Sequence, residues 1–426
     1  MGENQTTDCE AAEPDTSTRE PGTRWPVALR SLRHRDFRRF WLGLIVSVMG
    51  TWMQMVAQGW LVLELTGSAL YLGFVGACAT APMLVFTLPG GVVADRLSKR
   101  KILLVTQSLA MVQAFTLAAL TYSGAVQVWH VMTLAACLGT VNAFDMPTRH
   151  AMVIDLVGRE DVRNAVPLNS SAFNTGRIIG PAVAGVLVAS AGLPGCFLIN
   201  GFTFIPMLVV LAFMSPRKPA LRETNESVLH QIKEGLRWVR GQRVAMALLA
   251  MIAVTSVFAM PQATLLPLFA KSVFQMGPKG YGYMMSAYGL GALCSAVALT
   301  VFSNRLRLGA LVTAGSFLFP VALLGLMAAP RYSFAVGSLF LLGMGMMLFN
   351  AVVNIILQKA PPDELRGRVM SLRTFLFVGM MPLGNLQIGA VGEWLGPRAA
   401  VGIGGLVCLA AAIVLWWRVP RVRQSD

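Results

Sequence analysis

Charged residues are scarce in this sequence. Asp, Glu, Lys and Arg make up 13% of its 426 residues, whereas hydrophobic residues make up 55%. Ordinary soluble domains contain about 25% charged residues. So few charges cannot cover two or three water-facing domains of ~150 residues each, so most of the surface is predicted to face lipid. The 41 glycines and 22 prolines agree, because both residues are more frequent in transmembrane helices than in soluble ones.

Other absences exclude further classes of protein. The six cysteines are far apart and form no CxxC or Cys/His cluster, so neither a disulfide framework nor a metal site is predicted. The sequence has no G-x-x-x-x-G-K-[ST] phosphate loop, nucleophile–base set or metal-ligand spacing. It therefore predicts no enzyme and no cofactor. The polar N-terminus has no apolar signal-peptide region, and residues 1–36 are predicted to be a disordered cytosolic tail.

Long apolar runs are plentiful. A hydrocarbon core ~30 Å thick needs ~20 apolar residues of helix. The sequence contains twelve such runs, predicted at 40–63, 70–94, 102–122, 127–147, 164–190, 194–213, 245–270, 281–303, 308–328, 332–357, 369–391 and 397–417. These runs predict an all-α polytopic membrane protein with twelve transmembrane helices.

One break between the runs is long and basic, and it divides the helices six and six. This linker, residues 214–244, has apolar residues at helical spacing and is predicted to contain an amphipathic helix at the membrane surface. The predicted units are therefore a bundle over 37–213, a bundle over 245–418 and a cytosolic tail over 419–426. The acidic–basic run that begins at Glu160 recurs at Asp363, an offset of 203 residues. Two pseudo-symmetric bundles place a substrate path at their interface.

The distribution of basic residues predicts the orientation. Cytosolic segments of membrane proteins are enriched in Lys and Arg. If the N-terminus is inside, 30 of the 35 cations fall in inside segments and only Lys271, Lys279, Arg331 and Arg398 fall outside. The remaining cation, Arg177, falls within a span. Both termini are therefore predicted to be cytosolic.

The inside loop after the second span contains Gly91, Asp95, Arg96, Lys99 and Arg100. Gly91 would allow neighbouring helices to approach closely, and Asp95 could pair with nearby bases where its helix ends. The alternative is an ordinary positively charged inside loop with one incidental acid.

A second motif lies in the fifth span and contains Gly176, Arg177, Gly180, Pro181 and Gly185. Small residues at this spacing permit close helix packing, and proline removes a backbone donor and bends the helix. Small-residue faces also occur in any helix bundle, so a purely structural role is the alternative.

Arg177 is predicted to lie deep in the membrane, about 13 residues or ~20 Å into its helix. A cation at that depth costs at least ~2.5 kcal/mol unless it faces a partner or a wet cavity. Asn169 and Phe173 share its face. A functional or gating role is favoured over a structural pairing, and its partner stays open.

Acids are rare in the spans. Asp145 and Arg149 are four residues apart at the inside end of span 4 and are predicted to pair with each other or with the Asp95 loop. Glu64, at the outside end of span 1, is the candidate proton carrier if it is buried; otherwise it is an exposed helix-end acid. The uncharged candidates for the cavity are the amides Gln54, Gln58, Asn169, Asn174, Gln262, Asn350, Asn354 and Asn385.

These motifs resemble those of a known superfamily. The loop from Gly91 to Arg100 is similar to the signature G-x-L-A-D-R-x-G-R-K of the major facilitator superfamily. The motif from Gly176 to Gly185 resembles its antiporter motif G-x-x-x-G-P-x-x-G-G, which is typical of proton-linked exporters. The stretches 144–149 and 362–371 resemble the branch that contains bacterial enterobactin-type siderophore exporters and drug efflux proteins. In that superfamily the loop stabilises one conformation by ion pairs, which here implicates Asp95 and Arg96.

The sequence therefore predicts a monomeric secondary transporter in the bacterial cytoplasmic membrane. It would export amphiphilic small molecules, drug-like compounds or siderophores, by alternating access, with protons as the second partner and no nucleic acid. A proton-linked nutrient importer and an accessory subunit of a secretion system are the alternatives.

Overall fold

The computed structural model describes residues 27–214, 228–302 and 307–419, and within these ranges the chain contains helices and no strand. The first part of the chain forms η1 (Val27–Arg33), α1 (Arg35–Thr66), α2 (Ala69–Arg96), α3 (Lys99–Tyr122), α4 (Val128–Thr203) and α5 (Ile205–Phe213). The second part forms α6 (Val228–Gly241), α7 (Arg243–Phe258), α8 (Gln262–Leu268), η2 (Phe269–Val273), α9 (Gly277–Phe302), α10 (Leu308–Ala328), α11 (Tyr332–Lys359), α12 (Asp363–Gly379) and α13 (Met381–Arg418).

Glycines with positive φ divide the longest helices into separate arms. Gly158 and Gly192 interrupt α4 at φ 75° and 73°, and Gly396 interrupts α13 at φ 83°. Only glycine adopts this backbone conformation without strain. Gly192 and Gly396 have nearly the same φ and ψ, and each is followed within two residues by a proline, so the turn repeats in the two halves.

Nine stretches in the described part of the chain are long and apolar enough to cross a membrane. Two of these stretches, Asn164–Phe213 and Asp363–Arg418, contain Gly192 and Gly396 and therefore comprise two crossings each. The first arm of α4 is not among the nine. A polytopic helical fold is therefore confirmed, and the exact count of twelve stays a prediction.

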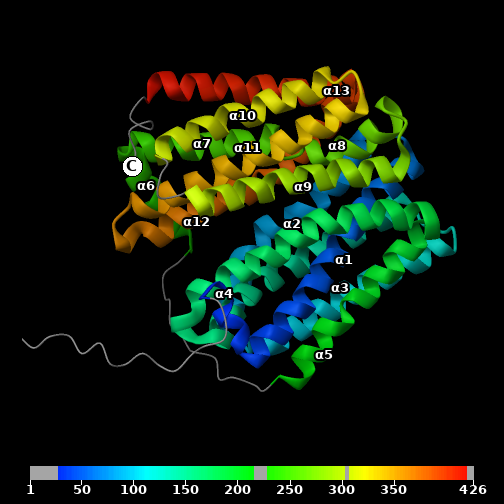
Figure 1. The fold of residues 1–426 in the computed structure, drawn as a ribbon, viewed down its shortest axis with the longest axis horizontal. Coiled ribbons are helices and arrows are strands. Elements are labelled where there is room, and N and C mark those ends of the chain that lie inside the picture. Colours follow the sequence, from blue (N-terminus) through cyan, green and yellow to red (C-terminus); the bar gives the residue numbers. More distant parts are fainter. Residues whose placement is uncertain (1–26, 215–227, 303–306, 420–426) are drawn as a thin grey trace, which may run out of the picture.

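The helices gather into two groups. Figure 1 shows α1 to α5 together in one group and α7 to α13 in the other. The groups meet where α2 packs on α13 and where α4 packs on α9. We call the end of the bundle with η1, α6 and Arg418 the termini end, and the end with the Gly192 and Gly396 turns the opposite end.

Glycines let the two groups meet closely at the opposite end. A β-carbon on Gly73 of α2 would lie 2.5 Å from the Asn385 carbonyl oxygen and 2.9 Å from Gly389 Cα. On the other side of the bundle, a β-carbon on Gly282 of α9 would lie 2.4 Å from the Pro181 carbonyl oxygen. Both contacts are backbone against backbone, so a larger residue would force the helices apart.

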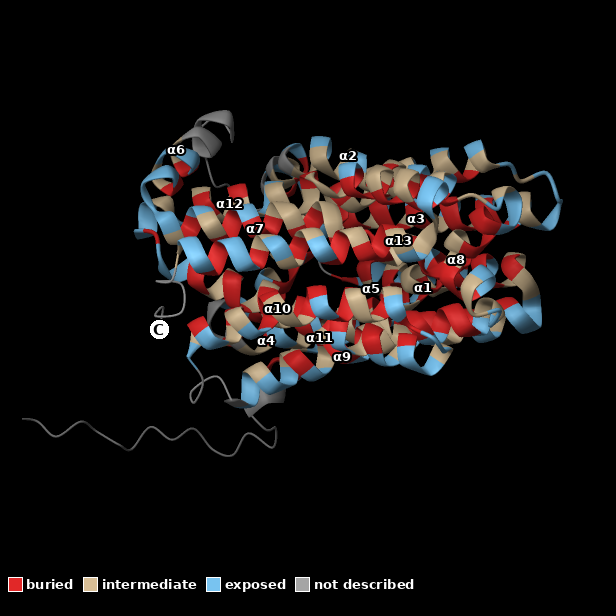
Figure 2. Cartoon of the chain, turned by 90° about the horizontal axis from the view of Figure 1, so that it is seen from above, coloured by how far each residue is buried: buried red, intermediate tan, exposed pale blue. Residues whose placement is uncertain are grey.

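The outer faces of the helices carry large apolar residues. Figure 2 shows exposed residues along the outer helix faces and buried ones between the helices. Val85, Val105 and Leu406 are each more than half exposed in mid-helix. A helix surface of this kind is stable in lipid and costly in water.

Two predictions about the termini end can be compared with the structure. The linker was expected to contain a helix, and α6 forms it, with Glu234 ion-paired to Arg368 of α12. A disordered tail over 1–36 is wrong for residues 27–36, which form η1 and the first residues of α1. Residues 1–26, 215–227 and 420–426 lie outside the described part of the chain.

Candidate functional site

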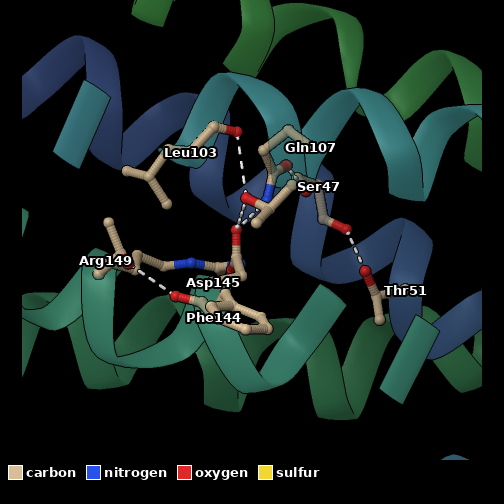
Figure 3. A network of polar contacts seen from close by, with 9 residues as sticks. Ser47, Thr51, Leu103, Gln107, Phe144, Asp145 and Arg149 are labelled. Carbon is tan, nitrogen blue, oxygen red and sulfur yellow. Dashed lines mark hydrogen bonds and ion pairs between the residues drawn. The ribbon is translucent and has the colours of Figure 1, made fainter. Parts of the chain in front are cut away.

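Asp145 and Arg149 form a buried ion pair in the first arm of α4, as the four-residue spacing predicted. Asp145 Oδ1 also accepts hydrogen bonds from Thr106 Oγ1 at 2.9 Å and Gln107 Nε2 at 2.7 Å, and Ser47 Oγ donates to Gln107 Oε1 at 3.1 Å (Figure 3). The carboxylate therefore has a full set of donors from α3 and α4. A charge satisfied in this way ties helices of one half together.

The loop signature is anchored within the first half of the chain. Lys99 Nζ lies 2.6 Å from Asp155 Oδ2, and Arg100 donates to the carbonyl oxygens of Leu211 and Ala212 at 2.6 Å each. Arg96 is exposed, and the Asp95 side chain lies outside the described part of the structure. The two terminal bases of the signature therefore bond α4 and α5.

The close helix contact that was expected at Gly91 is made by Gly90. A β-carbon on Gly90 would lie 2.5 Å from the Ala143 carbonyl oxygen, whereas Gly91 faces open space. Successive residues of a helix point about 100° apart, so two adjacent residues face different surroundings.

The second arm of α4 packs on two helices through the glycine motif. β-Carbons on Gly176 and Gly180 would meet Val48, Met49 and Trp52 of α1 within the same half. One on Gly185 would lie 3.0 Å from the Pro278 carbonyl oxygen of the other half. Ser286 Oγ of α9 also donates to the Ile178 carbonyl oxygen at 2.7 Å. The motif therefore holds α4 against both α1 and α9.

Arg177 lies where the two halves meet and is half-buried. Its Nη2 donates to Asn174 Oδ1 at 3.0 Å, and its guanidinium carbon lies 6.0 Å from the centre of the Tyr288 ring on α9. Its Nε is buried and has no acceptor. Among the described residues no carboxylate forms an ion pair with Arg177, so its neighbours are an amide and an aromatic ring.

Arg373 on α12 is a second half-buried cation, which the charge count assigned to an inside loop although it falls within the predicted span 369–391. Its guanidinium carbon lies 5.7 Å from the Phe377 ring centre, and its Nε has no acceptor. Arg177 is therefore not the single cation inside the spans. The position of Arg373 within an apolar run was the signal that could have identified it.

One face of the second arm of α4 shows how the interior opens. In order from the Gly158 end, that face carries Val166, Ser170, Phe173, Arg177, Ala184 and Val188. Val166 is 50% exposed, whereas Ala184 is fully buried. Ile179 and Val186 are on the opposite face and are exposed as lipid-facing residues are. The face with Arg177 therefore points into the protein, and access to it decreases from the termini end.

Helix α11 shows the same gradient. Asn350 and Asn354 are half-buried, and Gln358, one turn nearer the termini end, is exposed. Between α2 and α12 lies a cavity of about 240 Å³ lined by residues that include Leu84, Thr87 and Thr374. The bundle is therefore accessible from the termini end and closed at the opposite end.

The candidate amides separate into packing residues and residues at the interface. Gln54 is buried within the first half, where it donates to Gln113 Oε1 at 2.8 Å and accepts from Asn200 at 2.6 Å. Asn385 joins the halves, because it accepts from Thr264 at 2.9 Å and donates to Thr80 at 3.4 Å.

Gln262 and Asn169 are buried with unsatisfied groups. Both polar atoms of the Gln262 amide lack a hydrogen-bond partner, as does Asn169 Oδ1. Gln58 is half-buried. Gln54 therefore serves the packing of the first half through its hydrogen bonds. Asn385 and Gln262 are at or beside the contact between halves.

The two outer-end acids are both exposed but have different hydrogen-bond partners. Glu64 is exposed and accepts a hydrogen bond from Trp60 Nε1 at 2.6 Å, so the burial expected of a proton carrier is absent. Glu393 bonds the start of α2 across the interface. No group of three His, Cys, Asp or Glu side chains able to hold a metal is present among the described residues.

Two helical halves that are closed at one end and accessible from the other define a secondary-transporter fold. Residues 27–426 match the transmembrane secretion effector family, and the chain belongs to this family of major facilitator superfamily transporters.

Comparisons with known proteins agree with this family. The chain is 25% identical to the staphyloferrin A transporter of Staphylococcus aureus, with 89% of this chain and 95% of that protein covered. It is 27% identical to the multidrug efflux pump Tap of Mycolicibacterium fortuitum, over 88% and 94%. It is 23% identical to macrolide efflux protein A of Streptococcus pyogenes, over 89% and 94%.

Solved structures share the fold. The D-xylose–proton symporter is similar with a TM-score of 0.72 and 14% identity, covering 92% of this chain and all of that one. The nucleoside transporter NupG is similar with a TM-score of 0.69 and 14% identity, covering 90% and 98%. The arrangement of helices expected from the sequence motifs is therefore confirmed as a major facilitator fold.

Proposed function

We propose that this protein exports amphiphilic small molecules from the cytosol by alternating access. The observation that carries the proposal is the exposure gradient on α4 and α11, which makes the interior accessible from one end while glycine contacts close the other. A secondary transporter needs such a site between two halves. The relatives named for efflux of several drugs and of macrolides support export of drug-like compounds, and the staphyloferrin A transporter supports siderophores.

The same proposal includes the orientation. The basic residues of α6 and of the loops support a cytosolic location of the termini end, in which case the described conformation would face inward. Homologues from bacteria support a bacterial cytoplasmic membrane. The bundles 37–213 and 245–418 would rock about their interface as units of a monomer that catalyses no covalent step.

Inward proton flow is the proposed driving force. The antiporter-like motif at Gly176 to Gly185 supports it, because this motif holds α4 against the moving half. The loop from Gly91 to Arg100 and the Asp145–Arg149 pair would stabilise individual conformations. Glu64 and Glu393 are both exposed, but only Glu393 bonds the other half of the protein, so Glu393 is the better candidate for an acid that responds to the outer face.

Transport into inside-out vesicles tests this function. Purified protein is reconstituted, an inside-acid pH gradient is imposed, and uptake of radiolabelled erythromycin and of ethidium is followed. We expect uptake that stops when nigericin collapses the gradient. Uptake unchanged by nigericin would contradict proton coupling alone. Transport only in the reverse direction would favour an importer, and no movement without a partner protein would favour an accessory subunit.

A further inference from the structure

Among the described residues no carboxylate pairs with Arg177, and the buried carboxylates Asp145 and Asp161 are already bonded to other cations. Asp145 is paired with Arg149, Asp161 with Arg33 and the partly buried Asp155 with Lys99. A guanidinium held at this depth without a carboxylate is costly unless an anion reaches it.

The surroundings of Arg177 leave part of the guanidinium available. Asn174 accepts one hydrogen bond from Nη2, and the Tyr288 ring provides a flat neighbour from the other half. Neither neighbour neutralises the charge, and Nε still lacks an acceptor. A planar guanidinium in this state matches the two oxygens of a carboxylate, which it binds through paired N–H groups.

Access to Arg177 is from the proposed cytosolic side. On its face of α4, Val166 and Ser170 are exposed, Arg177 is half-buried, and Ala184 beyond it is fully buried. Arg177 therefore lies near the closed end of the accessible part of this face. A ligand entering from the termini end would meet apolar side chains first and the cation last.

We propose that Arg177 binds an anionic group, most simply a carboxylate, of the exported molecule. The inference rests on the proposed function and adds the substrate class: amphiphiles with an apolar body and a carboxylate. The apolar body would lie along Val166 and Phe173, and the carboxylate would complete the hydrogen bonds of Arg177. Tyr288 is contributed by the second half, so ligand binding at Arg177 would involve both halves.

Equilibrium binding of two matched probes tests the proposal. Dansylglycine carries a carboxylate, and dansylglycinamide is its uncharged counterpart. Binding is measured by dansyl fluorescence in nanodiscs of phosphatidylcholine alone, so that no anionic lipid competes. The variants are Arg177→Gln and Arg177→Lys. Arg373→Gln is the matched control, because Arg373 is also half-buried beside an aromatic ring and has an unbonded Nε.

We expect wild-type protein to bind dansylglycine about tenfold more tightly than the amide, a difference of ~1.4 kcal/mol. Arg177→Gln should remove this preference without changing amide binding, Arg177→Lys should retain part of it, and Arg373→Gln should retain all of it. The proposal is overturned if Arg177→Gln keeps the preference, if Arg373→Gln also removes it, or if wild-type protein shows none. Absence of binding of both probes up to about 1 mM would overturn it equally.

Thermal unfolding and size-exclusion profiles confirm that each variant is folded. A folding failure of Arg177→Gln leaves Arg177→Lys and the wild-type preference to decide. The vesicle assay distinguishes a wrong role for Arg177 from a wrong transport function. If vesicles export erythromycin and the carboxylate preference is absent, only the role of Arg177 is wrong. If vesicles move neither erythromycin, ethidium nor dansylglycine in either direction, the proposed function itself fails.

Discussion

Ser68 and Glu393 join the two halves of the protein at the end opposite the termini. The Ser68 hydroxyl donates to Glu393 Oε2 at 2.7 Å, and the Leu70 N–H donates to the same oxygen at 3.1 Å. Ser68 is the N-cap of α2, and its oxygen also accepts from the Leu70 and Tyr71 N–H groups. A carboxylate from α13 thus occupies the positive end of the α2 dipole, where a negative charge is stabilised.

Replacement of Glu393 by Gln should favour opening at this end. The neutral amide interacts more weakly with the helix dipole, which is worth about 0.3–1 kcal/mol, so the open population should rise by about two- to fivefold. Spin labels would be attached at Tyr122→Cys and Trp394→Cys in a background without the native cysteines. Double electron–electron resonance would then report a longer distance between the two labels. Both positions are highly exposed near this end.

The control for this change is Glu64→Gln. Glu64 is also an outer-end acid, but it bonds Trp60 within its own helix and does not join the halves. It should leave the distance distribution unchanged. Equal shifts in the two variants would show that loss of negative charge, rather than the Ser68 contact, sets the equilibrium.

Loss of one partner of the Asp145–Arg149 pair should destabilise the first half strongly. Asp145→Asn leaves the Arg149 guanidinium buried without a counter-ion, at a cost of about 3–5 kcal/mol in the free energy of unfolding. Unfolding by dodecyl sulfate in mixed micelles measures the loss. The double variant Asp145→Asn, Arg149→Met removes both charges and should recover most of it. A single variant within about 1 kcal/mol of wild type would contradict this role.

Asp161 should fix η1 to the start of the second arm of α4. Its carboxylate lies 2.8 Å from His34 Nε2, 3.0 Å from Arg33 and 3.4 Å from Arg30, and its carbonyl oxygen accepts from Ser31. In Asp161→Asn, amide hydrogen exchange over 27–33 should accelerate severalfold at pH 7, since charge-assisted bonds are lost. Asp155→Asn, which removes the partner of Lys99, should not affect these amides.

The contribution of Asp161 should depend on pH in a defined direction. The His34 hydrogen bond and the nearby Arg33 and Arg30 charges hold the pKa of Asp161 below its ordinary value of 3.8. A carboxyl with a lowered folded-state pKa stabilises the fold above the ordinary value and loses that contribution as pH falls through the lowered one. The difference in unfolding midpoint between wild type and Asp161→Asn should therefore be present at pH 5 and shrink below ~4. A difference that shrinks already between pH 7 and 6 would implicate another group.

The sequence predicted features that depend on one helix or on spacing along it. Apolar runs predicted the membrane helices, and a four-residue spacing predicted the Asp145–Arg149 pair. Contacts between distant segments were not predictable in this way. η1 is ordered because Asp161, more than a hundred residues away, bonds Arg30 and Arg33 of η1 and the adjacent His34.

The sequence also did not predict which neighbouring helix each residue of a helix faces. Gly90 rather than Gly91 contacts α4, because adjacent residues on a helix face different neighbours. Arg177 has one neighbour close in sequence and one distant from it. Asn174 is three residues away on the same helix, whereas Tyr288 is on the other half. A sequence can indicate that a deep cation needs a partner, but the packing of the halves decides which aromatic ring lies beside it.

The glycine contact between α4 and α9 should be needed for closure and not for folding. A β-carbon on Gly282 would lie 2.4 Å from the Pro181 carbonyl oxygen and 3.1 Å from Gly185 Cα, so Gly282→Ala cannot fit without separating the halves. The added carbon meets only residues of the other half and changes no packing within either half, so the variant should fold. Gly337→Ala on α11 is the matched control, because nothing lies within 4 Å of its added carbon. With the same spin labels, Gly282→Ala should shift the population to longer distances and reduce vesicle transport at least severalfold, whereas Gly337→Ala should do neither. Wild-type distances and transport in Gly282→Ala would show that closure tolerates a wider contact than this structure has.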